Sequence, residues 1–389
     1  MATLPRKLLN EVRNSLTYFP IVAIIGPRQV GKTTLVKQLI SNTGEECIYL
    51  DLERASDLNK LTDPELFFSQ NREKMIIIDE IQFKEDLYPL LRSLVDETRK
   101  PGQFILLGSA SPDLIRDSSE TLAGRIAYHR LHPLTMDEIP LEMDQNKLWI
   151  RGGFPDALLA PTSDLTWQWM ENFVNTYLNR DLLQLGLNAP GRTIRNLWSM
   201  LAHSSGQILN TSTFASSLGL SSPTINKYID FLEGAFLIYS LQAFAPNMKK
   251  RLVKRPKLYL TDTGILHHLI GTENFNELAG HPGLGASWET FVLNQILAIK
   301  KRMIKIFFYR THHGAEADFV LTKGEKVVAG IEVKYTNSPK LTKGNHNAFQ
   351  DLNSPTNFVI TPSSDDYLLQ KNIRVCSLKT FLKNYLPEL

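Results

Sequence analysis

The chain has 389 residues with 43 basic and 40 acidic side chains, and its net charge of +3 is too small to argue for a nucleic-acid partner by itself. Hydrophobic residues make up 43%, which excludes general disorder, and the length allows two or three domains. Cys47 and Cys376 lie far apart and form no metal or redox spacing. The N-terminus lacks the continuous apolar stretch of a secretory signal, and no run of 18 apolar residues exists. We therefore expect a cytoplasmic protein without a membrane span.

The first strong motif follows an amphipathic helix expected over residues 6–16 and a buried strand expected over residues 21–25. GPRQVGKT comes directly after that strand, fits G-x-x-x-x-G-K-[ST] at every fixed position, and is followed by apolar residues with helical spacing. In such a loop, backbone amides and a helix N-terminus bind phosphates, the lysine neutralises the β/γ-phosphates and the threonine ligates Mg²⁺. The predicted nucleotide-binding residues are Gly26, Pro27, Arg28, Gln29, Val30, Gly31, Lys32, Thr33 and Thr34, with Lys32 also catalytic and Thr33 also a metal ligand.

Three further strands are expected over residues 47–51, 75–80 and 104–111. The second of them ends in Asp79 and Glu80, a Walker B pattern in which Asp79 holds Mg²⁺ and Glu80 orients or deprotonates the attacking water. The third ends in small polar residues, so Ser109 or Ser111 can sense the γ-phosphate or the water. Strands that alternate with helices predict a doubly wound parallel sheet.

GPRQVGKTT, IIIDEIQ and LLGSAS, followed by LAGRI at 122–126, RGGFP at 151–155 and YLNRD at 177–181, resemble the AAA+-type ATPases of bacteria and archaea. The group they are most similar to fuses this ATPase to a C-terminal domain of unknown function, and the resemblance covers nearly the whole chain. It implies an ATP-binding protein. It also implies Arg28, Arg125 and Arg180 as candidates for an arginine finger or sensor, and we favour Arg125 as the catalytic one. A structural ion pair is the alternative role for each.

The middle of the chain predicts a helix-rich block over residues 146–204 and then a winged helix. Residues 211–218 read as a short helix stopped by Gly219, and Ser222 is expected to cap a second helix that has Pro223 at its first position. A helix in that position enters the major groove in helix-turn-helix proteins, while a basic wing contacts phosphates. Packing against neighbours is the alternative. The predicted DNA contacts are Lys227, Lys249, Lys250, Arg251, Lys254 and Arg255.

The C-terminal part carries a second set of polar residues. Glu289 lies in an amphipathic helix, while Asp318 and Glu332 flank a hairpin turn at residues 322–325, with Lys334 on the same face as Glu332. This Glu…Asp…Glu-x-Lys set is similar to the PD-(D/E)xK nuclease superfamily, in which carboxylates bind Mg²⁺ and the lysine helps to activate water. Ala317 stands where the superfamily has proline. Solvated charges on a surface strand are the alternative.

The sequence therefore predicts a multidomain α/β protein. It has an AAA+-type P-loop core with a parallel sheet (1–145), a helical lid or connector (146–205), a winged helix (206–262) and a restriction-endonuclease-like α/β domain (263–389). The expected function is ATP binding with Mg²⁺-dependent hydrolysis, coupled to DNA binding. An ATP-gated DNA-binding or toxin-regulating switch with little turnover, and an ATP-dependent metal nuclease, are the alternatives. Besides ATP and Mg²⁺, candidate partners are DNA, further copies of the chain or another protein.

Overall fold

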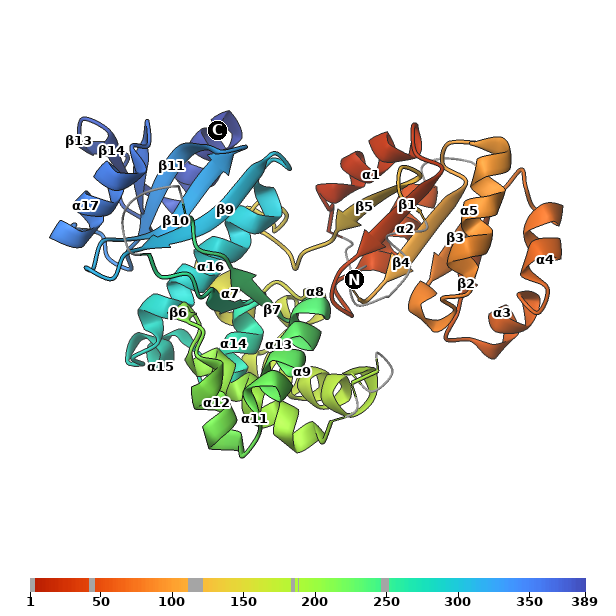
Figure 1. Ribbon diagram of the computed structural model, residues 1–389, viewed down its shortest axis with the longest axis horizontal. Coiled ribbons are helices and arrows are strands. Elements are labelled where there is room, and N and C mark those ends of the chain that lie inside the picture. The colour runs from red at the N-terminus through yellow and green to blue at the C-terminus, as the bar shows by residue number, and fades with distance from the viewer. Residues whose placement is uncertain (1–3, 42–45, 111–121, 183–185, 188, 246–251) are drawn as a thin grey trace. The chain divides into compact units, whose positions relative to one another are not determined.

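The computed structural model describes residues 4–41, 46–110, 122–182, 186–187, 189–245 and 252–389, which form two compact units (Figure 1). The first unit comprises Met1–Leu141 with two later segments, Arg180–Asn188 and Asp230–Leu237. The second unit comprises Glu142–Asn179, Ala189–Ile229 and Ile238–Leu389. Among the described residues, no helix combines the length and the apolar character that a bilayer crossing requires.

The first unit is built on a five-stranded parallel sheet in the order β2-β3-β4-β1-β5. Its strands are β1 (Ile21–Ile25), β2 (Cys47–Asp51), β3 (Met75–Asp79), β4 (Phe104–Gly108) and β5 (Ile126–Arg130). The helices that accompany them are α1 (Leu8–Leu16), α2 (Lys32–Ser41), α3 (Ala55–Lys60), α4 (Pro64–Gln70) and α5 (Leu87–Thr98), with a 3₁₀ turn η1 (Ile81–Phe83). These elements confirm the predicted strands and the doubly wound arrangement.

Both faces of this sheet are buried, which explains the continuous apolar runs in its strands. On one face Ala23, Ile76 and Leu106 pack in one core with Leu91 and other residues of α5. Side chains that alternate with these, such as Ile24 and Ile77, point to the other face and are also fully buried. Because β1 lies between β4 and β5, the loop that leaves its carboxyl end has a neighbouring strand on each side.

The second unit begins with helices and a small antiparallel sheet in the order β6-β8-β7. Its first helices are α7 (Gln145–Arg151), α8 (Pro155–Leu158), α9 (Ser163–Thr176) and α11 (Gly191–His203), and a π-helix η2 (Tyr177–Asp181) follows α9. The small sheet and the helices around it are β6 (Gln207–Ile208), α12 (Thr211–Leu218), α13 (Ser222–Gly234), β7 (Ile238–Leu241), β8 (Lys257–Leu260), α14 (Thr263–Ile270) and α15 (Phe275–Ala279). The last residues of α13, from Asp230 on, belong to the first unit. The short helix α12 ends at Gly219, as predicted.

The start of α13 corrects one detail of the sequence analysis. The helix begins at Ser222, and the hydroxyl of Ser221, not of Ser222, accepts the backbone N–H of Thr224 at 3.3 Å. Two adjacent serines are chemically equivalent caps, so only the backbone direction decides between them. Pro223 therefore takes the second helical position, and the apolar side chains of Ile225, Ile229 and Leu232 on this helix are buried.

The unit ends in a six-stranded mixed sheet in the order β13-β14-β12-β11-β10-β9. Its elements are α16 (Leu284–Ile299), β9 (Ile304–Arg310), β10 (Glu316–Lys323), β11 (Lys326–Val333), α17 (Lys343–Leu352), β12 (Asn357–Thr361), β13 (Tyr367–Gln370) and β14 (Ile373–Ser377), followed by the short turns α18 (Leu378–Thr380), η3 (Phe381–Tyr385) and η4 (Leu386–Glu388). The predicted hairpin is confirmed, because β10 and β11 pair antiparallel around Gly324 at φ +61°.

Two described segments between β7 and β8, residues 242–245 and 252–253, pair with the end of β9. The N–H of Phe244 donates to the carbonyl of Phe308 at 2.7 Å, and the N–H of Val253 donates to the carbonyl of Arg310 at 3.0 Å. These bonds cover backbone groups on an edge strand that would otherwise be free to pair with another chain. They also tie the three-stranded sheet to the six-stranded sheet within the second unit.

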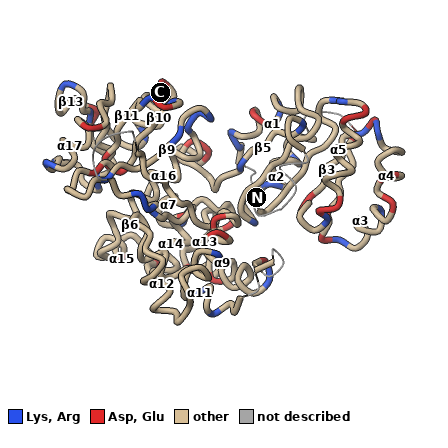
Figure 2. Tube along the Cα trace, viewed as in Figure 1, with Lys and Arg blue, Asp and Glu red and all other residues tan. Residues whose placement is uncertain are grey.

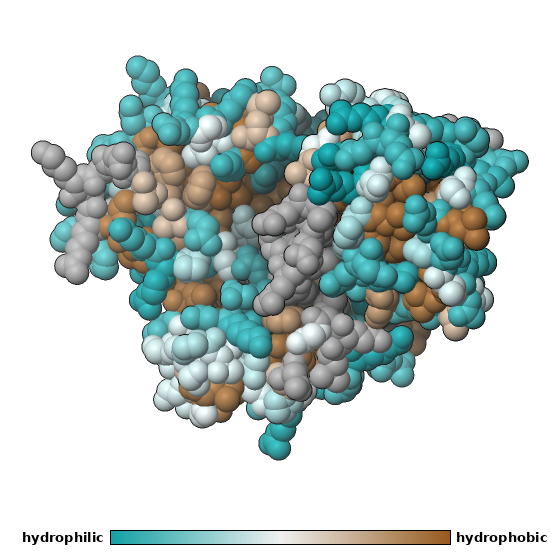
Figure 3. Space-filling model, turned by 45° about the vertical axis from the view of Figure 1, so that its right-hand side comes forward, coloured by the Kyte–Doolittle hydropathy of each residue, from teal (hydrophilic) through white to brown (hydrophobic). Residues whose placement is uncertain are grey.

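Charge and apolar surface are both spread out. In the view of Figure 2, Lys and Arg positions are interspersed with Asp and Glu positions in both units, in keeping with the net charge of +3. On the face shown in Figure 3, apolar residues form separate patches among hydrophilic ones. No band of one charge sign therefore dominates these views, and a nucleic-acid contact needs local basic residues.

Candidate functional site

The phosphate loop leaves the carboxyl end of β1 and runs into the N-terminus of α2. Gly26, Gln29 and Gly31 have positive φ angles of 154°, 60° and 100°, a backbone shape that favours glycine at the first and last of these positions. A Cβ at Gly26 would collide with the carbonyl oxygen of Leu131. The glycines of the motif therefore serve close backbone approach, and α2 presents its free N–H groups to the same place.

Lys32 is buried at the centre of this loop. Its Nζ donates to the carbonyl oxygens of Gly26 and Pro27, each at 3.0 Å, and to the hydroxyl of Ser109 at 2.9 Å. Burial lowers the pKa of Lys32, while the nearby Glu80 and Asp79 act in the opposite direction. All three hydrogen-bond partners are neutral, so the ammonium keeps charge with which to bind an anion.

Thr33 and Asp79 lie together beside the loop. The Thr33 hydroxyl donates to Asp79 Oδ2 at 2.9 Å, and the Tyr49 hydroxyl donates to the same oxygen. Burial raises the pKa of Asp79, and the two hydroxyl donors oppose that shift. Hydroxyl and carboxylate oxygens are the ligands that Mg²⁺ prefers, so this pair fits the metal that the motif implies. Tyr49 was missed by the sequence analysis, although its place in β2, next to β3, is the signal that points to it.

Glu80 and Ser109 complete the polar edge of the sheet. The Ser109 hydroxyl lies 3.1 and 3.2 Å from the two carboxylate oxygens of Glu80, so it links that carboxylate to Lys32. Glu80 has a left-handed backbone at φ +56°, and Gln82 donates to its side chain. A non-glycine residue held in this region is strained, and such strain concentrates at functional sites. Ser111, the other predicted sensor, lies outside the described residues.

The three candidate arginines separate into two places. Arg28 is largely buried and pairs with Glu53 and Asp181, and its Nε lies 3.9 Å from Glu80 Oε1. Arg180 reaches the same Glu53 at 3.6 Å but is mostly exposed. Asp181, which the sequence analysis did not select, is thus a direct partner of the phosphate-loop arginine.

Arg125 corrects the prediction of an arginine finger within the same chain. Its guanidinium makes a two-pronged pair with Asp96 at 2.6 and 2.8 Å. Its carbonyl accepts the N–H of Ile21, the first residue of β1. Arg125 is therefore at the amino ends of the parallel strands, one strand length from the phosphate loop at their carboxyl ends, and the structural ion pair is the role its contacts support.

The predicted DNA contacts are only partly described. Lys227 is exposed on α13, and Lys254 and Arg255 are exposed just before β8. Lys249, Lys250 and Arg251 lie outside the described residues. The described basic residues are thus available to solvent on two elements of the second unit.

The C-terminal candidates are brought together. Lys334 Nζ donates to Glu332 Oε1 at 2.6 Å, and the N–H of Val333 donates to Asp318 Oδ2 at 2.8 Å. Lys257 of β8 lies 3.3 Å from Glu289 Oε1 and 3.5 Å from Asp318 Oδ1. The sequence analysis missed three members of this cluster, which are Lys257, Tyr259 and Glu316. The alternation of side chains along a strand could have pointed to them, since each lies two residues from another member of the cluster and therefore on the same face of its strand.

The RGGFP motif supports structure. At the end of α7, Gly152 has φ +72° and faces Asp262, whose side chain accepts the N–H groups of Gly153 at 2.7 Å and Ile265 at 3.0 Å. Because Asp262 caps α14, the motif locks α7 to α14. The sequence analysis used RGGFP as a family signature and did not foresee this contact.

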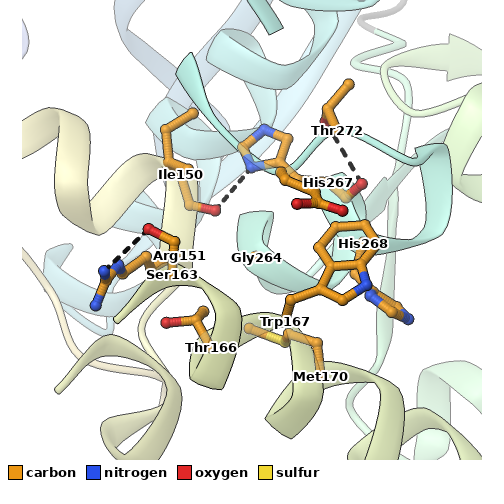
Figure 4. A pocket seen from close by; sticks show the side chains of 11 residues that line it. Ile150, Arg151, Ser163, Thr166, Trp167, Met170, Gly264, His267, His268 and Thr272 are labelled. Atoms are coloured by element: carbon orange, nitrogen blue, oxygen red, sulfur yellow. Dashed lines mark hydrogen bonds between the residues drawn. The ribbon is translucent and has the colours of Figure 1, made fainter. Parts of the chain in front are cut away.

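A small pocket opens beside this junction (Figure 4). His267 is buried there, with Nδ1 3.0 Å from the Ile150 carbonyl and Nε2 2.6 Å from the Ser287 hydroxyl, and burial lowers its pKa to about 4. Arg151 reaches Ser163 at 3.2 Å. His267 and Arg151 thus make hydrogen bonds to other residues of the protein, and we assign the pocket no part in the sites described above.

Family comparisons match the chain in three sections. Residues 18–140 match an AAA domain, residues 142–276 match a domain of unknown function (DUF8612), and residues 284–381 match another (DUF4143). With the parallel sheet and the phosphate loop described above, the first match defines an AAA-type ATPase domain of the P-loop class.

An uncharacterized protein of Mycobacterium tuberculosis is 36% identical over 363 residues, which cover 93% of this chain and 81% of that protein. The chain belongs to the family of this mycobacterial protein. An uncharacterized protein of Haemophilus influenzae is 26% identical over 286 residues, covering 66% of this chain and 70% of that one. Among solved structures, a Walker-type ATPase of Pyrococcus abyssi aligns with a TM-score of 0.46 and 16% identity, over 69% of this chain and 96% of that one.

Proposed function

We propose that this chain binds ATP with Mg²⁺ at the phosphate loop and hydrolyses it slowly. The observation that carries the proposal is the convergence of Lys32, Thr33, Asp79 and Glu80 at the carboxyl edge of one parallel sheet. A cation, two oxygen ligands and a carboxylate at one edge are the parts that phosphoryl transfer to water requires.

Each residue then has a separate role. Lys32 neutralises the β/γ-phosphates, while Thr33 and Asp79 hold Mg²⁺, which supplies charge neutralisation on the phosphate oxygens when bound. Glu80 orients or deprotonates the attacking water. Ser109, which contacts both Lys32 and Glu80, positions them relative to each other.

Two sets of contacts must change for hydrolysis, which supports slow turnover. Lys32 must exchange its bonds to the Gly26 and Pro27 carbonyls for bonds to phosphate oxygens. Glu80 must turn from Ser109 and the nearby Arg28 toward the water. Since Arg28 also pairs with Asp181, the position of that segment is coupled to the state of the catalytic carboxylate.

The test is a nucleotide-binding and hydrolysis assay with and without DNA. Lys32→Ala should lose ATP binding, whereas Glu80→Gln should bind ATP and hydrolyse it roughly 10²–10⁴-fold more slowly, the usual contribution of a general base. Lys37→Ala, which removes an exposed lysine of α2, is the matched control and should behave as wild type. Wild-type turnover by Glu80→Gln would eliminate Glu80 as the residue that activates water.

A second candidate is an ATP-gated DNA-binding switch with little turnover, which could regulate a toxin or another partner protein. The order helix, strand, two helices and hairpin from α11 to β8, with the sheet order β6-β8-β7, favours a winged helix. Asn226 and Lys227 are exposed on α13, the helix that would enter the major groove. Stoichiometric ATP binding without turnover, together with DNA binding that changes on ATP addition, would favour the switch over the ATPase.

The metal nuclease remains a third candidate because α16 carries Glu289, β10 carries Asp318, and Glu332 and Lys334 lie in β11 and directly after it. Lys257 argues against it, since its ammonium already lies among the carboxylates. Mn²⁺-dependent cleavage of DNA that Asp318→Ala abolishes would support the nuclease.

A further inference from the structure

Lys257 is a buried cation surrounded by carboxylates. Only 3% of its side chain is exposed, and its Nζ lies 3.0 Å from Glu316 Oε1, 3.3 Å from Glu289 Oε1 and 3.5 Å from Asp318 Oδ1. One partner comes from α16 and two come from β10, while Lys257 itself comes from β8. A single ammonium therefore joins three elements at one point.

The remaining members of the cluster are arranged around this ammonium. The Tyr259 hydroxyl, two residues along β8, donates to Glu289 at 2.5 Å. Only 4% of the surface of Glu332 is exposed, and its Oε2 has no hydrogen-bond partner among the described residues. Lys334 pairs only with Glu332 and is one-third exposed, so it is a peripheral cation, whereas Lys257 is the central one.

The charges explain why a cation is required there. Burial lowers the pKa of Lys257, but Glu289, Asp318 and Glu316 outweigh burial and raise it overall. Burial raises the pKa of Glu289 to about 7, and the charge on Asp318 adds to this shift. Carboxylates that share a site repel each other unless a cation lies between them.

We propose that Lys257 Nζ is the resident cation of this cluster, in the place that a divalent metal would take, and that the native cluster is therefore metal-free. Among the described residues, no group of three or more His, Cys, Asp or Glu side chains is arranged to hold a metal ion. The ammonium of Lys257 lies within 3.0–3.5 Å of one oxygen from each of Glu316, Glu289 and Asp318, so it takes the central position among these carboxylates.

Lys257 cannot easily leave to admit a metal. Its backbone lies in the central strand of the three-stranded sheet, opposite Ile208 on one side and Leu241 on the other. Moving the side chain out would leave a buried group of like charges without compensation, and breaking a buried ion pair in this way is strongly destabilising. The cluster thus fixes β8 to α16 and β10, and it becomes a divalent-metal site only when the lysine charge is removed.

The test uses the full chain with Asp79→Asn added, which removes the metal ligand of the ATPase site. Mn²⁺ binding is counted by electron paramagnetic resonance of the free ion. With Lys257 intact we expect no saturable Mn²⁺ site. Lys257→Met should gain one bound Mn²⁺ per chain, and adding Asp318→Asn should remove it. Lys326→Met, which removes an exposed lysine from the same hairpin, is the control and should gain none.

Two results would overturn the proposal. One is a saturable Mn²⁺ site in the protein with Lys257 intact that Asp318→Asn abolishes, since this would mean that a metal and not the lysine occupies the cluster. The other is a folded Lys257→Met protein that binds no Mn²⁺. If Lys257→Met is strongly destabilised, its thermal unfolding midpoint is measured without metal, with Mn²⁺ and with Mg²⁺. A rise that Asp318→Asn cancels supports the proposal, and no rise contradicts it.

Discussion

Replacing Gly152 by alanine should destabilise the second unit through one identifiable collision. A Cβ at this position would lie 2.6 Å from Asp262 Oδ2 and closer still to Oδ1. Asp262 cannot move away freely, because its carboxylate accepts the N–H of Gly153 at 2.7 Å and the N–H of Ile265 at 3.0 Å. The substitution therefore acts on the cap of α14 as well as on the backbone of α7.

The magnitude follows from two parts. A side chain at φ +72° and ψ −179°, a region that essentially only glycine adopts, costs about 1–3 kcal/mol. Displacing Asp262 sacrifices two hydrogen bonds to a charged group, each worth about 1.5–3 kcal/mol. The total of roughly 4–9 kcal/mol is a large fraction of the ~5–15 kcal/mol that stabilises a typical domain. At ~2–4 °C per kcal/mol, the unfolding midpoint of the second unit should fall by at least about 8 °C.

Gly271→Ala is the control for a side chain at a positive φ angle that meets no collision, although its ψ of 34° differs from the −179° of Gly152. Gly271 ends the same helix at φ +75°, and a Cβ there would meet nothing within 4 Å. It should cost only the ~1–2 kcal/mol of the left-handed backbone. Thermal unfolding followed by circular dichroism, with hydrogen exchange of the α14 amides, measures both variants. Equal losses in the two proteins would refute the argument that Gly152 is required by Asp262.

Three further predictions concern charge. Arg28→Ala should slow ATP hydrolysis, measured as phosphate release at matched protein concentration, whereas Arg125→Ala should leave the rate unchanged. Equal losses of rate in the two variants would contradict the assignment of the two arginines to opposite ends of the sheet. Asp262→Asn should change the pH dependence of the denaturation midpoint. Burial raises the Asp262 pKa from 3.8 to about 6, so its stabilising contribution is lost as pH rises through that window, while His267, whose pKa falls from 6.5 to about 4, loses its contribution as pH falls. In the Asp262→Asn protein, the free energy of unfolding should therefore decrease as the pH is lowered from 6.5 to 4. A free energy that stays constant over this range would contradict the assignment of the pH dependence to His267. Lys227→Ala should reduce the salt dependence of duplex binding by about one phosphate contact, and an unchanged slope would place this residue outside the interface.

The sequence predicted the ATPase core well because that core is specified locally. The apolar runs of β1, β3 and β4 have no other stable place than the centre of a covered parallel sheet. The phosphate loop needs its glycines wherever it occurs, and the hairpin at Gly324 follows from period-two strands on both sides of a turn. The sequence could not foresee the ion pair of Arg125 with Asp96, because a motif gives residue type without saying at which end of a strand the residue emerges.

The sequence by itself determined the class of fold, the phosphate-binding loop and the four C-terminal residues that resemble a nuclease set, because each depends on neighbours within a few positions or on a strand period. Only the tertiary structure decided which partners these residues have. Asp181 reaches Arg28 across 153 positions of sequence, and Lys257 reaches Asp318 from another sheet. A buried charge takes its chemistry from whatever the fold brings within a few ångströms of it, since in the interior no water screens or replaces that partner. The carboxylates of Glu289 and Asp318 would bind a metal with an uncharged side chain at position 257, and beside Lys257 they form ion pairs with its ammonium.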